Sequence, residues 1–168
     1  SEKHSAEDIV RLLNRYFSMQ VDTIFRHGGT LDKFIGDAIM AFWGAPEEDP
    51  QHACRAIAAA MEMINNLQVF QKSLRAEGIE FDIGIGLHTG SAVVGFIGSD
   101  TRKDYTIIGD TVNLASRLEG LTKGIARVLI SEETKKLCHE RYHFKDHGTH
   151  QVKGREEYVH VFEPEEIQ

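Results

Sequence analysis

The sequence predicts one mixed α/β domain that covers residues 1–168. Long segments with apolar residues at helical spacing alternate with short segments rich in β-forming residues, which is the pattern of an α/β fold. The length suits a single domain with a full core. The composition, 41% hydrophobic and 27% charged, is that of an ordinary globular protein.

Two long helices are predicted at residues 6–27 and 53–74. In the first, apolar residues recur every three or four positions until Gly28 and Gly29, which end the helix. The second is rich in alanine, the residue that favours helix most, and places its larger apolar residues on one side. A shorter helix is predicted to begin at Ser131, an N-cap residue that is followed by two glutamates.

The strands are predicted from β-forming segments between these helices. Residues 31–44 read as two strands joined by a tight turn at Gly36 and Asp37. Residues 81–88 alternate apolar side chains with polar residues or glycine, which indicates a strand with one buried face. Further strands are expected at residues 92–97, 104–108 and 127–130, and a closing hairpin at residues 142–152 and 158–162.

The most informative segment is residues 104–120, a short strand followed by a helix with a polar face. Asn113 and Arg117 are four residues apart, so they lie one turn apart on that face. The buried stripe of the same helix is formed by Leu114, Leu118 and Leu121. An amide and a guanidinium directed at one spot suit an anionic, hydroxyl-bearing ligand such as a nucleotide. Taken alone, the pattern is more typical of two solvated surface residues.

The hairpin at residues 31–44 carries two polar residues that its turn does not require. Lys33 lies in a strand that should have one apolar face, and Asp37 lies at the tip, within reach of solvent. Asp37 is either a simple turn residue or an oxygen ligand for a hard cation such as magnesium.

Two other patterns favour structural interpretations. The glycines of residues 84–90 resemble a dinucleotide-binding loop, but the third glycine is one position late and a strand follows. They instead predict that a neighbouring chain segment or ligand approaches the strand closely. Four histidines have spacings that one helix face could gather into a metal site: His139, His143, His147 and His150. Gly148 and the β-like surroundings break that helix, so we expect exposed strand and loop residues.

Charge and cysteine content limit the partners and the compartment. The net charge of −7, with no dense run of Lys and Arg, argues against nucleic-acid binding and against direct membrane contact. Cys54 and Cys138 lie far apart without metal-ligand spacing, so we expect buried, free thiols in a reducing compartment. No apolar run approaches the roughly 18 residues that span a bilayer, and no signal peptide is visible. The expected location is cytoplasmic, on its own or as the cytosolic part of a larger or anchored protein.

Residues 28–44, 82–98 and 104–120 resemble, in this order and at these separations, the signature blocks of the class III nucleotidyl cyclase catalytic domain. This is the fold of adenylate and guanylate cyclases, and Val152-Lys153-Gly154 fits it too. The resemblance implies an α+β sandwich with a ferredoxin-like core. It also implies conversion of a nucleoside triphosphate to its 3′,5′-cyclic monophosphate and pyrophosphate, with two Mg²⁺ or Mn²⁺ ions in each site.

The resemblance assigns roles to individual residues. Asp37 matches one of two metal-binding aspartates. Asn113 and Arg117 match the residues that position the ribose and stabilise the transition state. Lys153 matches the lysine that holds the terminal phosphates. These types suit attack of the ribose 3′ oxygen on the α-phosphorus, which needs cations and a guanidinium where negative charge builds up.

Lys33 and Thr106 match the pair that reads the purine edge in this family. Lys33 is a donor, which suits the N1 acceptor of adenine, and Thr106 can accept from the exocyclic amine. Guanylate-specific relatives carry residues that look like Glu and Cys at these positions. The resemblance therefore favours ATP as substrate and an adenylate cyclase. The alternatives are a guanylate cyclase, or a non-catalytic cyclase-homology module that dimerises or senses nucleotide.

The chain departs from the family pattern at its start. Relatives begin with a strand and an Asp-Ile-x-Gly-Phe-Thr loop that supplies the other metal aspartate, whereas residues 1–4 look like the segment just after that loop. We therefore expect an N-terminally incomplete domain that is by itself inactive. The resemblance further implies a head-to-tail homodimer with two sites at its interface. Each site would draw Asp37 from one subunit and the other site residues from its partner.

Overall fold

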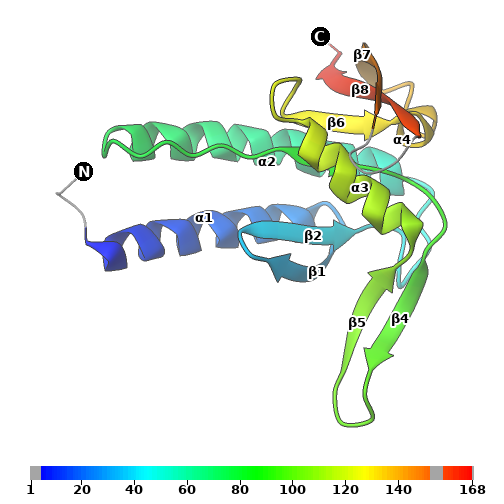
Figure 1. Cartoon of the computed structure of the whole chain (residues 1–168), viewed down its shortest axis with the longest axis horizontal. Helices are drawn as coiled ribbons and strands as arrows, with labels where there is room; N and C mark the ends of the chain where they lie inside the picture. The colour runs from blue at the N-terminus through cyan, green and yellow to red at the C-terminus, as the bar shows by residue number, and fades with distance from the viewer. Residues whose placement is uncertain (1–4, 152–156, 168) are drawn as a thin grey trace.

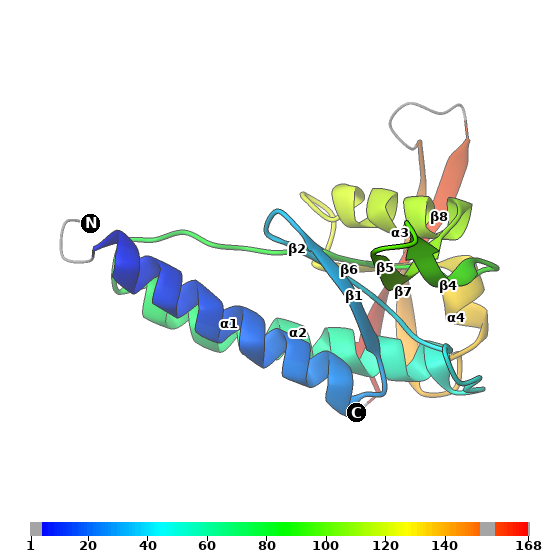
Figure 2. The same ribbon diagram turned by 90° about the horizontal axis from the view of Figure 1, so that it is seen from below.

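The computed structural model describes residues 5–151 and 157–167. Helices α1 (Ala6–Arg26) and α2 (His52–Arg75) lie side by side and run in opposite directions (Figure 1 and Figure 2). Ser5 caps α1 by accepting a hydrogen bond from the backbone N–H of Asp8 at 3.2 Å. Both predicted long helices are confirmed.

Two antiparallel hairpins carry three of the candidate site residues, Lys33, Asp37 and Thr106. In the first, β1 (Thr30–Ile35) pairs with β2 (Ala38–Phe42), and Gly36 takes a positive φ of 60° in the turn. In the second, β4 (Val93–Gly98) pairs with β5 (Lys103–Ile108) and projects from the body of the domain (Figure 1). Both hairpins agree with the sequence prediction.

A four-stranded sheet forms the centre of the other half of the domain. Its strands lie in the order β3 (Ile85–Leu87), β6 (Val128–Ser131), β8 (Tyr158–Glu166) and β7 (Tyr142–Gln151). β3 pairs with β6 in parallel, and the other pairs are antiparallel. The predicted closing hairpin is β7 with β8.

Two shorter helices complete the fold. α3 (Asp110–Leu121) follows β5, and α4 (Glu132–Lys136) follows β6. Ser131 is the N-cap of α4, as predicted, and its hydroxyl accepts from the backbone N–H of Thr134 at 3.4 Å.

Helices α2 and α3 cover opposite faces of the four-stranded sheet. Val128 and Ile130 of β6 pack in a cluster with Ile57 of α2. Leu129, between them, packs with Leu118 of α3. Successive side chains of a strand point to opposite faces, so β6 is buried along its whole length between the two helices. This mixed α/β architecture confirms the predicted fold class.

The strand predicted at residues 81–88 is shorter than expected and covers only Ile85–Leu87. Phe81 and Ile83 instead pack against the cluster between α1 and α2 that includes Tyr16 and Phe70. In the described part of the chain no strand pairs with residues 81–84. The backbone oxygen of Phe81 accepts from a glutamine side chain of α2 at 2.6 Å. The alternation of apolar and polar residues at this segment therefore results from burial against helices, and not from pairing in a sheet.

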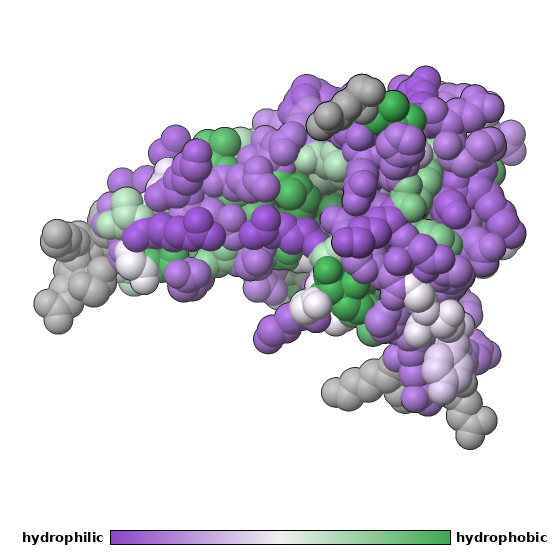
Figure 3. Space-filling model, turned by 90° about the horizontal axis from the view of Figure 1, so that it is seen from above, coloured by the Kyte–Doolittle hydropathy of each residue, from purple (hydrophilic) through white to green (hydrophobic). Residues whose placement is uncertain are grey.

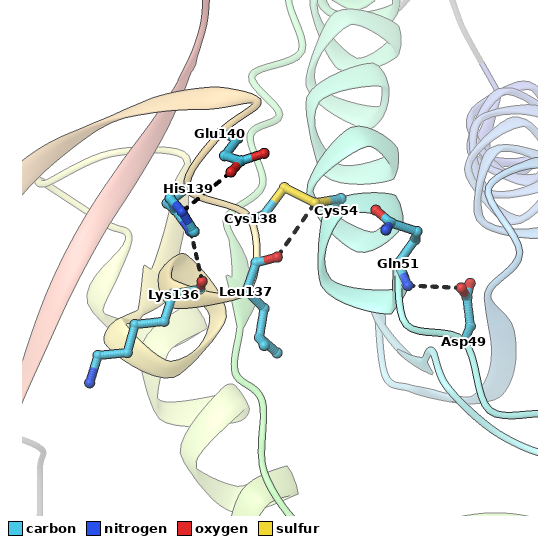
Figure 4. The surroundings of a disulfide bond; sticks show 8 residues. All are labelled: Asp49, Gln51, Cys54, Lys136, Leu137, Cys138, His139 and Glu140. Carbon is cyan, nitrogen blue, oxygen red and sulfur yellow. Dashed lines mark hydrogen bonds and ion pairs between the residues drawn. A yellow bond between two sulfur atoms is a disulfide. The ribbon is translucent and has the colours of Figure 1, made fainter.

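The expectation of free thiols is wrong. Cys54 of α2 and Cys138, just after α4, form a disulfide with their Cα atoms 5.3 Å apart (Figure 4). Their sequence separation is 84 residues, and only the packing of α4 against the sheet brings them together. Burial of both residues is confirmed, because they are 6% and 3% exposed.

The surface is mostly hydrophilic on the face shown in Figure 3, with small apolar patches between polar side chains. Within the described ranges, none of the helices combines the length and the apolar character that a membrane crossing requires.

Candidate functional site

The site is organised by the connection from β5 into α3. Gly109 links the two elements with a φ of 138°, a conformation that glycine adopts without strain. α3 then packs closely on β3: a Cβ at Gly86 would lie 2.3 Å from the backbone nitrogen of Glu119 and 2.6 Å from the backbone oxygen of Ala115. Gly86 therefore allows the close approach of a neighbouring segment, as predicted, and that segment is α3.

Asn113 and Arg117 lie on α3, four residues apart, as the sequence predicts. Asn113 is exposed, Arg117 is partly exposed, and Leu118 on the other side of the helix is buried. The polar face of α3 is thus free of the packing that holds the helix to the sheet. Their roles toward a ligand remain predictions.

Lys33 of β1 and Thr106 of β5 meet at a residue that the sequence analysis did not select, Asp32. The Thr106 hydroxyl oxygen lies 2.9 Å and 2.7 Å from the two carboxylate oxygens of Asp32. The backbone N–H of Ile107 donates to Asp32 Oδ2 at 3.3 Å, and Lys33 Nζ lies 3.9 Å from Oδ1. The structure thus brings Lys33 and Thr106, predicted from separate motifs, to one carboxylate.

Burial makes this cluster unusual. The Asp32 side chain is 2% exposed and Thr106 is 6% exposed, whereas the Lys33 side chain is 49% exposed. A carboxylate is costly to bury unless it accepts hydrogen bonds, so a buried aspartate is expected to have specific partners. The signal in the sequence that could have identified Asp32 is its position as a charged residue inside a β-forming segment.

An irregularity in β1 places Asp32 and Lys33 together. The register runs from Leu31 opposite Ala41 to Lys33 opposite Met40, which leaves Asp32 as an extra residue in a β-bulge. Successive residues of a regular strand point to opposite faces, but a bulge redirects a side chain. Both polar side chains can therefore face the same site.

β5 is held against the β1–β2 hairpin by more than this cluster. The ring centroid of Tyr105 lies 6.0 Å from that of Phe42 in β2 and 5.2 Å from that of Phe96 in β4. Aromatic pairs at these separations add attraction beyond the area they bury. Thr106, the next residue, is therefore fixed by packing on one face and hydrogen bonds on the other.

Asp37 lies apart from the other site residues. It is exposed in the turn of the β1–β2 hairpin, which points away from β4 and β5 in both ribbon views (Figure 1 and Figure 2). Within residues 5–151 and 157–167, no group of three or more His, Cys, Asp or Glu side chains could hold a metal ion. Lys153 lies outside the described residues.

The histidines noted in the sequence have other partners. His143, His147 and His150 lie on β7, which confirms that no helix gathers them. His147 Nε2 lies 2.9 Å from Glu163 Oε1, and His150 Nε2 lies 2.7 Å from the backbone oxygen of His147.

His88, at the end of β3, was not singled out by the sequence analysis. Its Nδ1 lies 2.8 Å from the Ser131 hydroxyl and 3.5 Å from a carboxylate oxygen of Glu133. Burial lowers the pKa of His88, and the nearby charges of Glu133 and Asp110 only partly oppose this effect. His88 is therefore neutral at pH 7, next to the start of α4.

Comparison with known proteins identifies this arrangement. Residues 1–163 match the family described as the adenylate and guanylate cyclase catalytic domain. The chain belongs to this family, as the sequence resemblance predicted. Adenylate cyclase 1 of Rhizobium meliloti (strain 1021) is 39% identical over 165 residues, which are 97% of this chain and 25% of that protein. The chain thus spans about a quarter of the length of this curated relative.

Solved structures agree in fold. The adenylyl cyclase CyaB from P. aeruginosa matches with a TM-score of 0.87 and 37% identity, covering 99% of this chain and 87% of that chain. The guanylate cyclase domain of RhGC from Catenaria anguillulae, solved in complex with GTP, matches with a TM-score of 0.83 and 29% identity, covering 100% of this chain and 89% of that chain. Since the fold matches both kinds of cyclase, the choice of base depends on individual site residues.

Proposed function

We propose that this domain converts ATP to 3′,5′-cyclic AMP and pyrophosphate. The observation that carries the proposal is the meeting of Lys33 and Thr106 at Asp32. An ammonium group suits the N1 acceptor of adenine, and a hydroxyl oxygen can accept from its 6-amino group. The adenylate cyclases among its relatives support the same substrate.

The remaining residues act on the ribose and phosphates. The ribose 3′ oxygen forms a bond to the α-phosphorus, the bond from that phosphorus to the bridging oxygen breaks, and the 3′ hydroxyl proton passes to solvent. Asn113 would position the ribose through its amide. Arg117 would stabilise the negative charge that builds up on the α-phosphate, where a fixed guanidinium is most effective. Lys153 would hold the terminal phosphates.

The domain would also use two Mg²⁺ or Mn²⁺ ions. When bound, such cations would supply Lewis acidity toward the attacking oxygen and would offset the negative charge of the triphosphate. The described residues fit only part of such a site, because Asp37 is a single carboxylate and two close cations need shared oxygen ligands. Asp37 would therefore supply one of the oxygen ligands that such ions require.

We also propose a head-to-tail homodimer in which Asp37 completes the partner's site. The turn that carries Asp37 points away from β5, which leads into α3 (Figure 2). Large apolar side chains are exposed on both hairpins: Phe34 (49%), Ile35 (58%), Val93 (62%), Phe96 (72%) and Ile108 (49%). Exposed apolar clusters of this kind favour association, and a twofold axis would repeat the shared site twice.

We infer a cytoplasmic location because ATP, the proposed substrate, is abundant in that compartment. Disulfides are rare in that compartment. Whether Cys54 and Cys138 are oxidised or reduced in the protein therefore has to be measured.

A second function is a cyclase-homology module that binds nucleotide without turnover. It is favoured by the lack of a carboxylate cluster within the described ranges. The two functions differ in product formation. Only the first predicts cyclic nucleotide.

The test measures cyclic AMP from ATP and cyclic GMP from GTP, with Mg²⁺ and with Mn²⁺. It uses the 168-residue chain and the same chain extended upstream. We expect cyclic AMP from the extended chain, with loss of activity in Arg117→Ala but not in the matched control Lys123→Ala, an exposed cation just after α3. Nucleotide binding without product in the extended chain would favour the non-catalytic module. Preference for GTP would overturn the assignment of Lys33 and Thr106.

A further inference from the structure

The hydrogen bond between Thr106 and Asp32 has a fixed direction. An ionised carboxylate only accepts hydrogen bonds, so the Thr106 hydroxyl is the donor. A threonine hydroxyl has a single proton, and Asp32 holds it. Thr106 therefore presents only lone pairs to any ligand that approaches its oxygen.

We propose that Asp32 is a positioning residue that sets the hydrogen-bond direction of Thr106 and thereby makes the base site select a 6-aminopurine. This inference rests on the proposed function. With its proton held, Thr106 accepts from the 6-amino group of adenine and cannot donate to the 6-oxo group of guanine. A hydroxyl without such a partner rotates and serves either base. Asp32 thus turns an ambiguous side chain into an acceptor.

Asp32 also positions Lys33 for the recognition of adenine. Lys33 Nζ lies 3.9 Å from Asp32 Oδ1, while half of the Lys33 side chain remains exposed. An ammonium group has three donors, so donors remain for a ligand after this contact. Ring position N1 accepts in adenine and carries a proton in guanine. The carboxylate therefore holds a donor opposite N1 and an acceptor opposite the 6-position.

The contact from Ile107 makes the consequence of a substitution predictable. Its backbone N–H donates to Asp32 Oδ2, so in Asp32→Asn the amide oxygen must occupy the Oδ2 position. The amide NH₂ then occupies the Oδ1 position, which lies 2.9 Å from the Thr106 oxygen. Thr106 can then accept from this group, but the amide oxygen at the Oδ2 position lies 2.7 Å from the Thr106 oxygen and can still accept its proton. Asp32→Asn therefore keeps the shape of the side chain and no longer fixes the direction of the hydrogen bond, whereas Asp32→Ala removes both partners.

The experiment compares kcat/KM for ATP, GTP and purine ribonucleoside triphosphate, which lacks the 6-amino group, in the form of the chain that makes cyclic nucleotide. Removing the amino group should lower kcat/KM of the unaltered protein by about 10-fold, the value of one hydrogen bond in such a site. Asp32→Ala leaves the hydroxyl without a partner, so it should lose less from that removal and its ATP to GTP ratio should fall by about 10-fold. Asp32→Asn, which no longer fixes the direction of the hydroxyl, should change both quantities in the same direction by a smaller factor. The matched control is Asp104→Asn, an exposed aspartate two residues before Thr106 on β5.

Substitutions of Thr106 separate positioning from a structural role. Thr106→Ser keeps the hydroxyl and should keep the preference for ATP. Thr106→Ala has no hydroxyl to orient, so adding Asp32→Asn to it should change the ratio no further. Circular dichroism checks that the Asp32 variants fold. If Asp32→Ala alone fails to fold, the shape-conserving Asp32→Asn is the second variant, and its ratio should also fall.

Two results would overturn the inference: an unchanged ATP to GTP ratio in folded Asp32→Ala, or a further change of the ratio when an Asp32 substitution is added to Thr106→Ala. Either would make Asp32 only a link between β1 and β5. Failure of the proposed function looks different, because the unaltered protein would then form no cyclic AMP or would prefer GTP.

Discussion

Cys54 and Cys138 join α2 to the segment after α4, with their Cα atoms 5.3 Å apart across a sequence separation of 84 residues (Figure 4). Both residues are buried in the cluster that packs α2 against β6 and β8. The bond therefore closes a long loop around the centre of the domain.

Reduction of this disulfide should lower the free energy of unfolding by about 4–5 kcal/mol, because the reduced unfolded chain regains the entropy of an 84-residue loop. Urea unfolding with and without dithiothreitol measures the effect. The control is the double variant Cys54→Ala and Cys138→Ala, which should not respond to reductant. An unfolding midpoint of the unaltered protein that does not change on reduction would contradict the prediction.

Stability should depend on pH through His88. Its pKa is lowered by burial in the folded state, so the unfolded chain binds the proton more readily. The stabilisation is then fully present above pH of about 6.5, the ordinary histidine value, and is lost as the pH falls from there toward the lowered pKa. His88→Gln should flatten this part of the profile in urea unfolding at several pH values. The control is His139→Gln, an exposed histidine, and a profile unchanged by His88→Gln would count against the assignment.

Asp37→Asn should lower the turnover of the extended chain at least about 100-fold with the fold intact. Asparagine suits a hairpin turn as well as aspartate, whereas a dication loses a charged ligand. Cyclic AMP formation with Mg²⁺ and the melting temperature are measured together. Glu48→Gln, in an exposed loop, is the matched control. Undiminished turnover would return Asp37 to the role of a plain turn residue.

A mixture of Asp37→Ala and Arg117→Ala chains should regain activity that neither variant has alone. In a symmetric dimer with shared sites, one site of each mixed dimer collects both substitutions and the other is intact. Random pairing makes about half of the dimers mixed, so activity should reach about a quarter of the normal value per chain. Cyclic AMP formation is measured after subunit exchange has been shown independently. A mixture that exchanges and stays inactive would exclude a site that spans the interface.

The sequence by itself determined the features that depend on local order. Helical spacing gave α1 and α2, and a Gly-Asp turn between β-forming segments gave the β1–β2 hairpin, because such patterns act within a few residues. The polar face of α3 with Asn113 and Arg117 followed in the same way. The order and separation of the motifs also predicted the cyclase family that the comparisons show.

Only the tertiary structure decided which distant residues meet. Asp32 and Thr106 are 74 residues apart, and a β-bulge together with the packing of two hairpins creates their contact. The pairing of Cys54 with Cys138 depends in the same way on how α2 and α4 lie on the sheet. The alternation of apolar side chains at residues 81–88 correctly predicted which side chains are buried, but not the element that covers them. Helices and sheets bury the same apolar side chains, and here the first half of the segment packs on helices. The local sequence pattern determines which side of a segment is buried, and long-range packing determines which element covers that side.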